Sequence, residues 1–320
     1  MKVPKVAFCK KSQLFTASLA LVFVALVVTS LTAQQAKPAE RTVELSVIVT
    51  DAGKKSVASL RKEDVHVFED KIEQTVQSIV VDERPIDCGL LIDSSASMRA
   101  LLSANLETAR LIIVNARPDD QFFISRFISS DKIQTVQDFT SDANLLVQAL
   151  STFYVEGGQS AIIDAIYVGA EHVSKHNAKN PGRRKVLIVI TDGEDRNSYY
   201  KSEHLQKLLR DLDVQVFAIG FTSKLERDKP GYLVPAAKDK AEKLLRTITE
   251  TAGGRVFFPT DRASLTEALA QLVNDMHSQF RLTYQSASDK KGFRKVEMKV
   301  TAAGGEKLNA VAPGGYYVEK

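Results

Sequence analysis

The stretch that decides the fold is CGLLIDSSAS, residues 88–97, where an apolar run ends at Asp93 and serines follow. A run without a polar face is typical of a strand that is covered on both sides of a parallel sheet. Comparable runs occur at Lys185–Thr191 and Val214–Phe221, and a weaker one at Gln121–Phe127. Amphipathic helical patterns separate these runs. The sequence therefore predicts an α/β fold with a doubly wound, mostly parallel sheet and right-handed crossovers.

Six segments carry the helical pattern, near residues 99–115, 142–152, 161–176, 199–211, 239–252 and 262–277. On both sides of this α/β part, in residues 41–81 and from Gln279 onward, apolar and polar residues alternate instead. Alternation with turns between the segments indicates antiparallel strands. We therefore expect the α/β domain to be inserted in a small antiparallel β domain built from both chain ends. The expected parts are a signal peptide (1–33), a linker (34–40), an N-terminal β segment (41–83), the α/β domain (84–278) and a C-terminal β segment (279–320) that packs with 41–83.

The chain has 320 residues, and its formal net charge of +4 comes from its N-terminus. Residues 1–33 contain four lysines and no acidic residue, and without these lysines the 43 basic and 39 acidic side chains balance. A neutral remainder argues against a nucleic-acid-binding or polybasic membrane-surface protein. The lysines precede the apolar run Leu19–Val28 and a small residue at Ala33, which is the pattern of a secretory signal. We expect an exported protein, periplasmic, cell-surface or secreted, that contacts the membrane only if this signal stays uncleaved as an anchor.

Oxygen-bearing side chains follow the predicted strands at their carboxyl ends, where open α/β sheets bind ligands. Asp93, Ser95 and Ser97 follow the first buried strand, Asp192 follows the strand that ends at Thr191, and Ser160 belongs to a Gly-rich loop. Each motif alone is more often a helix cap or a turn. Their joint occurrence at strand ends instead favours a cation site of two carboxylates and three hydroxyls, which suits Mg²⁺ or Mn²⁺. With few anionic ligands, such an ion would accept a carboxylate from a partner.

These residues resemble the metal-ion-dependent adhesion site of von Willebrand factor type A (VWA) domains, over roughly residues 84–278. The resemblance implies a Rossmann-like VWA fold, with the metal ligands Asp93, Ser95, Ser97, Ser160 and Asp192, some of them through water. Ala96 stands where Gly is frequent, and Ser160 where Thr is usual; both departures keep the oxygen donors.

The flanking segments resemble the bacterial exported VWFA-related family known best from Acidobacteria. The matching residues include Leu60, Asp64, the run Val67–Lys71, Gln74 and the terminal Gly315-Tyr316. Lys71 replaces a turn glycine of that family. If the turn needs positive φ, Lys71 costs about 1 kcal/mol or forces a different turn.

The leading hypothesis is a non-enzymatic binding protein whose Mg²⁺ site engages an acidic group of a partner protein or surface ligand. An envelope structural or assembly protein that uses the fold without a functional metal is the alternative. A metal-dependent hydrolase is the least favoured, because a two-metal site needs more carboxylates than Asp93 and Asp192.

Other polar residues receive structural interpretations. Cys88 lies in an apolar run and is expected to be a buried thiol. His172 and His176 lack a third ligand, so we expect them on a solvated helix face. The basic run Gly182–Lys185 is expected to form a solvated turn. Glu194 and Asp195 either tune the metal or cap the following helix, and we favour the cap.

Overall fold

The computed structural model describes residues 41–225, 236–288, 290–302 and 304–318. The signal peptide and linker that we predict for residues 1–40 lie outside the described residues. In the described part of the chain, no helix combines the length and hydropathy needed to cross a membrane.

The α/β part contains a six-stranded sheet in the order β6-β5-β4-β7-β8-β9, in which only β6 runs antiparallel to its neighbour. The strands are β4 (Ile86–Asp93), β5 (Gln121–Phe127), β6 (Ile133–Thr140), β7 (Arg184–Thr191), β8 (Gln215–Gly220) and β9 (Val256–Phe257). The helices are α2 (Leu102–Val114), α3 (Ala143–Leu150), α4 (Ile162–Asn177), α5 (Ser202–Leu212), α6 (Ala237–Thr251) and α7 (Arg262–His277). Short 3₁₀ turns, η3 (Ala96–Ala100) and η4 (Thr222–Lys224), follow β4 and β8.

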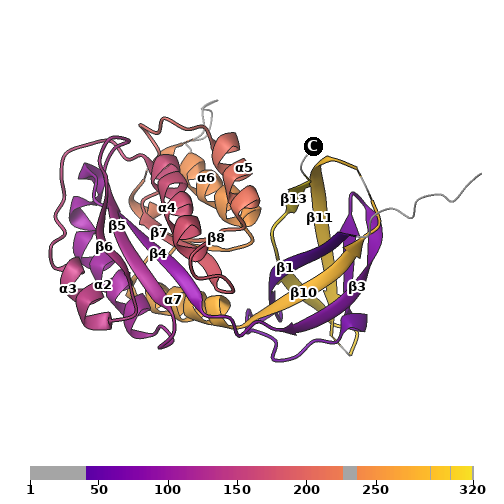
Figure 1. Cartoon of the computed structure of the whole chain (residues 1–320). Coiled ribbons are helices and arrows are strands. Elements are labelled where there is room, and N and C mark those ends of the chain that lie inside the picture. The colour runs from indigo at the N-terminus through magenta and orange to yellow at the C-terminus, as the bar shows by residue number, and fades with distance from the viewer. Residues whose placement is uncertain (1–40, 226–235, 289, 303, 319–320) are drawn as a thin grey trace, which may run out of the picture. The chain divides into compact units, whose positions relative to one another are not determined.

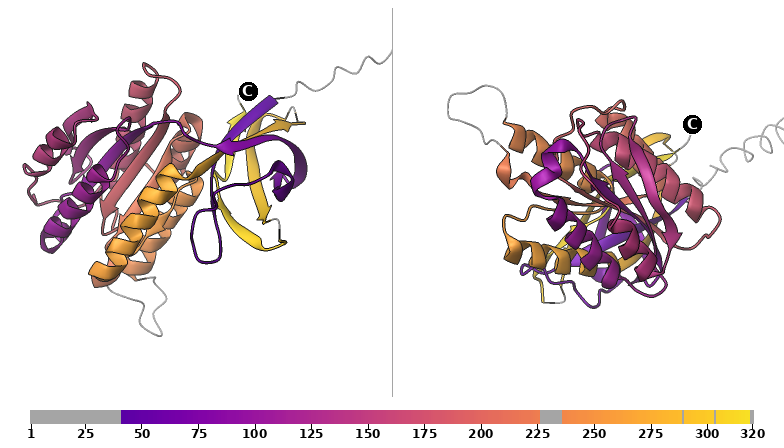
Figure 2. Two further views of the ribbon diagram at one scale, coloured as in Figure 1. Left: turned by 90° about the horizontal axis from the view of Figure 1, so that it is seen from below. Right: turned by 90° about the vertical axis from the view of Figure 1, so that its left-hand side faces the viewer.

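Helices cover both faces of this sheet, which confirms the α/β prediction (Figures 1 and 2). Successive residues of one strand point to opposite faces. Leu90 and Ile92 of β4 therefore pack with α2, α3 and α7, whereas Leu91 packs with α4, α5 and α6. Cys88 is fully buried among the first group, as predicted.

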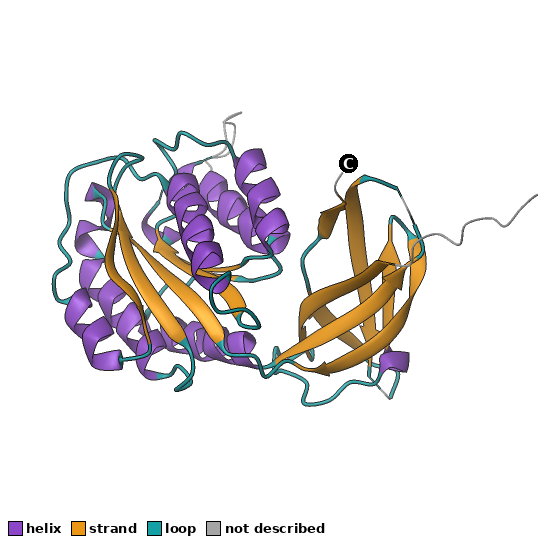
Figure 3. Ribbon diagram, in the orientation of Figure 1, coloured by secondary structure: helices purple, strands orange, loops and turns teal. Residues whose placement is uncertain are grey.

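The second sheet takes its strands from the N-terminal and C-terminal parts of the described chain (Figure 1), and this part consists mainly of strands (Figure 3). All its pairings are antiparallel. Its order is β12-β1-β10-β3-β2-β11-β13, and an additional pairing of β11 with β12 closes six of the strands into a ring. The strands are β1 (Arg41–Thr50), β2 (Val65–Glu69), β3 (Ile72–Val81), β10 (Gln279–Ser286), β11 (Gly292–Thr301), β12 (Lys307–Val311) and β13 (Gly315–Val318), and the 3₁₀ turn η2 (Lys62–Asp64) precedes β2. Alternate residues of β1, beginning with Val43 and Leu45, fill the interior.

A two-residue turn, Asp70-Lys71, joins β2 to β3 because Glu69 pairs with Ile72. Both turn residues have positive φ, 48° for Asp70 and 72° for Lys71. This conformation matches the twist of the flanking strands but favours Asn, Asp and Gly. The chain therefore keeps the turn and places a lysine in a strained conformation.

The histidine prediction was wrong, because it missed strand β6. Phe139 of β6 lies against α4, and the His176 ring stacks on it with 3.8 Å between ring centroids. His172 contacts the same ring at 5.4 Å, and its Nε2 lies 2.9 Å from Oδ1 of Asp138. The two histidines are thus only partly exposed, and their rings help to attach the edge strand to α4.

The basic run Gly182–Lys185, whose last two residues begin β7, is also not a solvated turn. Arg183 hydrogen-bonds to Asp87 and to the carbonyl oxygen of Ile86. Arg184 is 5% exposed, donates to the carbonyl oxygen of Met276 and lies 3.7 Å from Asp82. Burial lowers the pKa of Arg184 to about 10. Both arginines therefore stabilise the amino end of the sheet.

Candidate functional site

The candidate cation site consists of Asp93, Ser95, Ser97, Ser160 and Asp192. Asp93 is the last residue of β4, and Asp192 directly follows β7. Because β4 and β7 are neighbouring parallel strands, their carboxyl ends bring these two carboxylates to the same edge. Ser95 and Ser97 lie at the start of η3, and Ser160 lies two residues before α4.

Hydrogen bonds link four of the five residues. The Ser160 hydroxyl donates to Oδ2 of Asp93 (2.9 Å), and the backbone N–H of Ser95 donates to Oδ1 (3.0 Å). The hydroxyl oxygens of Ser95 and Ser97 are 3.2 Å apart. Asp192 makes a separate contact, accepting the N–H of Glu194 at 3.0 Å. The structure thus gathers the four residues by direct contact, and the charge of Asp192 acts on Asp93.

Asp93 is fully buried, and this burial raises its pKa to about 6, to which the nearby negative charge of Asp192 contributes. Hydrogen bonds from Thr191 and Ser95 act in the opposite direction. A bound cation would offset the repulsion between the two carboxylates. The donor set, two carboxylates and three hydroxyls, is one that hard divalent cations accept. Within the described residues, no cluster of three or more His, Cys, Asp and Glu forms a metal site, so a cation here would depend on the serine hydroxyls.

Thr191 is a site residue to which the sequence gave no role. Its hydroxyl donates to Oδ2 of Asp93 (2.6 Å) and accepts the N–H of Gly193 (3.1 Å). One hydroxyl therefore connects the carboxylate on β4 with the loop that carries Asp192. The only signal in the sequence was the position of Thr191 directly before Asp192.

Asp195 is a helix cap, but it caps a different helix from the one we expected. Its Oδ1 accepts the N–H groups of Ile162 (2.7 Å) and Ile163 (3.2 Å), which begin α4. In the part of the chain that the structure describes, the following helix, α5, receives no such contact from Asp195. The carbonyl oxygen of Ser160 accepts the N–H groups of Arg196 (2.8 Å) and Asn197 (3.1 Å). These bonds hold the loop after β7 against the loop that supplies Ser160.

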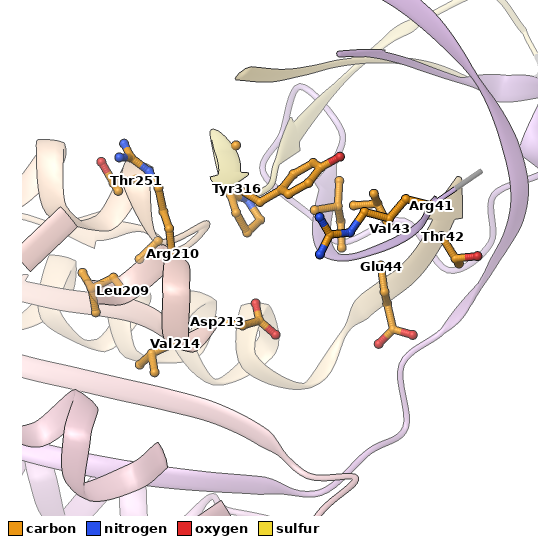
Figure 4. Close-up of a pocket in the computed structure, with 14 residues that line it drawn as sticks. Arg41, Thr42, Val43, Glu44, Leu209, Arg210, Asp213, Val214, Thr251 and Tyr316 are labelled. Atoms are coloured by element: carbon orange, nitrogen blue, oxygen red, sulfur yellow. The ribbon is translucent and has the colours of Figure 1, made fainter. Parts of the chain in front are cut away.

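A pocket of about 260 Å³ lies elsewhere, among β1, α5 and β13 (Figure 4). Charged side chains of both signs line it, including Arg41, Glu44, Arg210 and Asp213. None of the five candidate cation-site residues lines this pocket.

A doubly wound sheet with a cluster of oxygen donors at its carboxyl edge defines an α/β domain with a candidate cation site. The family model of the von Willebrand factor type A domain matches residues 87–271, which is more than half of the chain. The chain belongs to this family.

Solved structures similar to the chain include an aerotolerance-related membrane protein from Bacteroides fragilis NCTC 9343 with multiple mutations to serines. It has 18% identity and a TM-score of 0.45, with 60% of this chain and 100% of that chain covered. A von Willebrand factor type A protein from Catenulispora acidiphila has 13% identity and a TM-score of 0.46, with 89% and 74% covered. Proximal thread matrix protein 1 from the mussel byssus, with a zinc-occupied MIDAS motif, has 20% identity and a TM-score of 0.43, with 65% and 49% covered. A search of curated protein sequences gave no significant match.

Proposed function

We propose that this VWA-domain protein is a binding protein that holds Mg²⁺ or Mn²⁺ at Asp93, Ser95, Ser97, Ser160 and Asp192. The observation that carries the proposal is the convergence of two carboxylates and three hydroxyls at the carboxyl edge of the sheet. An ion held by only two anionic side chains retains affinity for a further anionic oxygen. The ligand is then a carboxylate of a partner protein or surface ligand, in an adhesion-type contact without catalysis.

The domain organisation and the location of the protein are part of the proposal. The pairing of β1 with β10 and of β2 with β11 supports one β domain from residues 41–83 and 279–320, with the VWA domain at 84–278 inserted in it. The lysine-rich apolar N-terminus supports export, and the flanking motifs support membership of the bacterial exported VWFA-related family.

Calorimetric titration with Mg²⁺, Mn²⁺ and Zn²⁺ tests the cation site. Zn²⁺ is included because one similar structure carries zinc. We expect saturable binding of Mg²⁺ or Mn²⁺ by the wild type and none by Asp93→Asn combined with Asp192→Asn. Asp119→Asn is the matched control, because this exposed aspartate precedes β5 at the opposite edge of the sheet. Equal binding by the wild type and the double variant, both folded by circular dichroism, would rule out the site.

The envelope structural role without a metal remains the competing function. It predicts that a partner binds equally well in Mg²⁺ and in EDTA. A pull-down from envelope extract, run in both conditions with the same variants, separates the two.

A further inference from the structure

Tyr199 is the most exposed of the large hydrophobic residues in the described part of the chain, with 81% of its surface accessible. It lies in the loop between β7 and α5, seven residues after Asp192 of the candidate cation site. This loop leaves the carboxyl end of β7, so Tyr199 and the site share one edge of the sheet. Tyrosine is enriched in protein interfaces, so an exposed tyrosine at the same sheet edge as the candidate site is a candidate contact for a partner.

The backbone that carries Tyr199 is fixed by an acidic residue in the first turn of α4. Asp164 accepts the N–H of Tyr199 at Oδ2 (2.7 Å) and the N–H of Tyr200 at Oδ1 (2.9 Å). Earlier in the loop, the carbonyl oxygen of Ser160 holds the N–H of Arg196. The loop is therefore attached both to a residue of the candidate cation site and to the helix that begins beside it.

The ring of Tyr199 also packs against a pair of stacked tyrosines. Tyr200 stacks on Tyr167 with 3.8 Å between centroids and an interplanar angle of 7°. Tyr199 contacts Tyr200 edge to face, with 5.3 Å between centroids and an angle of 84°. A ring held in this way loses little conformational entropy when a partner packs on it, as in the aromatic anchors of protein interfaces.

The neighbourhood of the site favours a polypeptide partner over a sugar. Two ion pairs lie near it, Arg196 with Glu194 and Lys132 with Glu156, so it is not a surface of a single charge sign. Arg126 covers the other exposed tyrosine of this edge, with its guanidinium 4.3 Å from the ring centroid of Tyr154. Aromatic residues and arginines are enriched in protein–protein interfaces, with polar groups around them.

We propose that Tyr199 is an apolar anchor for a polypeptide segment that presents a carboxylate to the candidate cation site. This inference rests on the proposed cation-dependent function. Tyr199 lies three positions after Arg196, whose N–H bonds to Ser160 of the candidate site, so at most roughly 11 Å of fully extended chain separates the two Cα atoms. An extended peptide covers that distance in about three to four residues. The partner therefore carries an apolar or aromatic side chain within about four residues of its acidic residue.

The test uses a phage-displayed library of random dodecapeptides, selected on the full protein in Mg²⁺ and eluted with EDTA. On the wild type we expect peptides enriched in Asp or Glu with an apolar residue within about four positions. On Tyr199→Ala we expect the acidic residue to persist and the apolar enrichment to disappear. A synthetic peptide from the wild-type selection should bind Tyr199→Ala at least tenfold more weakly, and Tyr199→Phe within about threefold of the wild type. Tyr317→Ala, at an exposed tyrosine of β13, is the control.

The outcomes separate this inference from the proposed function. Acidic peptides that bind Tyr199→Ala and the wild type equally would overturn the anchor and leave the cation site standing. Selection of no EDTA-eluted acidic peptide would overturn both. The assignment to a polypeptide would be overturned if no peptide were selected and the wild type bound alginate, a polyuronate, while Tyr199→Ala did not.

Discussion

A buried ion pair joins the N-terminal and C-terminal β segments of the described chain. Its removal is predicted to lower the free energy of unfolding. Glu69 of β2 and Arg294 of β11 are 2% and 1% exposed and lie 225 positions apart. Oε1 of Glu69 accepts hydrogen bonds from Arg294 and from Ser286 (2.8 Å). Oε2 accepts the hydroxyls of Tyr284 (3.0 Å) and Tyr316 (2.8 Å). Each oxygen of the buried carboxylate thus accepts two hydrogen bonds.

Arg294→Met removes the cation and leaves the Glu69 carboxylate buried without a counter-charge. Breaking a buried pair in this way costs about 3–5 kcal/mol of the free energy of unfolding. Adding Glu69→Gln removes the stranded charge but keeps an oxygen that accepts the tyrosine hydroxyls. We therefore expect the double variant to recover about 2 kcal/mol relative to Arg294→Met, which is the size of coupling seen for contacting residues.

Urea unfolding followed by far-UV circular dichroism measures both changes, because the chain has no tryptophan to report by fluorescence. Lys295→Met with Glu297→Gln is the matched control, an exposed ion pair on the same strand. Such surface pairs contribute about 0–1 kcal/mol. If Arg294→Met costs no more than Lys295→Met, or if the double variant is no more stable than Arg294→Met, the reasoning about the buried pair is wrong.

Three further predictions follow. Lys71→Gly should raise the free energy of unfolding by about 0.5–1 kcal/mol because it relieves the positive φ of the β2–β3 turn, whereas Lys62→Gly in η2 should not raise it in the same urea experiment. Thr191→Val should weaken Mg²⁺ binding by about 10–100-fold in calorimetry, because the hydroxyl orients Asp93. Thr191→Ser, which keeps the hydroxyl, should bind Mg²⁺ like the wild type, and unchanged affinity in Thr191→Val would refute this role. Burial alone would raise the pKa of Asp82, but the hydrogen bonds and charge of Arg84 and the charge of Arg184 lower it. Its stabilisation is therefore present above about pH 4 and lost as the pH falls through the folded-state pKa, so Asp82→Asn should flatten the acid limb of stability against pH more than Asp119→Asn does.

The sequence predicted those elements whose buried residues form a continuous apolar run or a regular helical pattern along the chain. The run Lys185–Thr191 became β7 within one residue, and the pattern at 262–277 matches α7. Strand β6 was missed because an edge strand is only partly buried and shows no continuous apolar run. The environment of Arg184 was missed for a different reason, since its carboxylate neighbour Asp82 is distant in sequence and only the folded sheet brings the two together.

The residues of the candidate site can also be divided into those that the sequence predicts and those that only the fold reveals. Four of its five oxygen donors lie in short motifs at the ends of β4 and β7, and Ser160 lies in a Gly-rich loop before α4, so the sequence alone suggests all five. The groups that orient these donors come from other loops and other strands. Thr191 reaches Asp93 across neighbouring strands, and Asp195 holds the start of α4 just after Ser160. From the neighbouring sequence alone, each of these residues would be assigned only to a turn or a helix cap. The Thr191→Val variant tests whether the donors alone are sufficient, because it keeps all five of them and removes only the hydroxyl that bonds to Asp93 and Gly193. Loss of Mg²⁺ binding in that variant would mean that the donor motif is insufficient for a cation site without the contacts that only the fold provides.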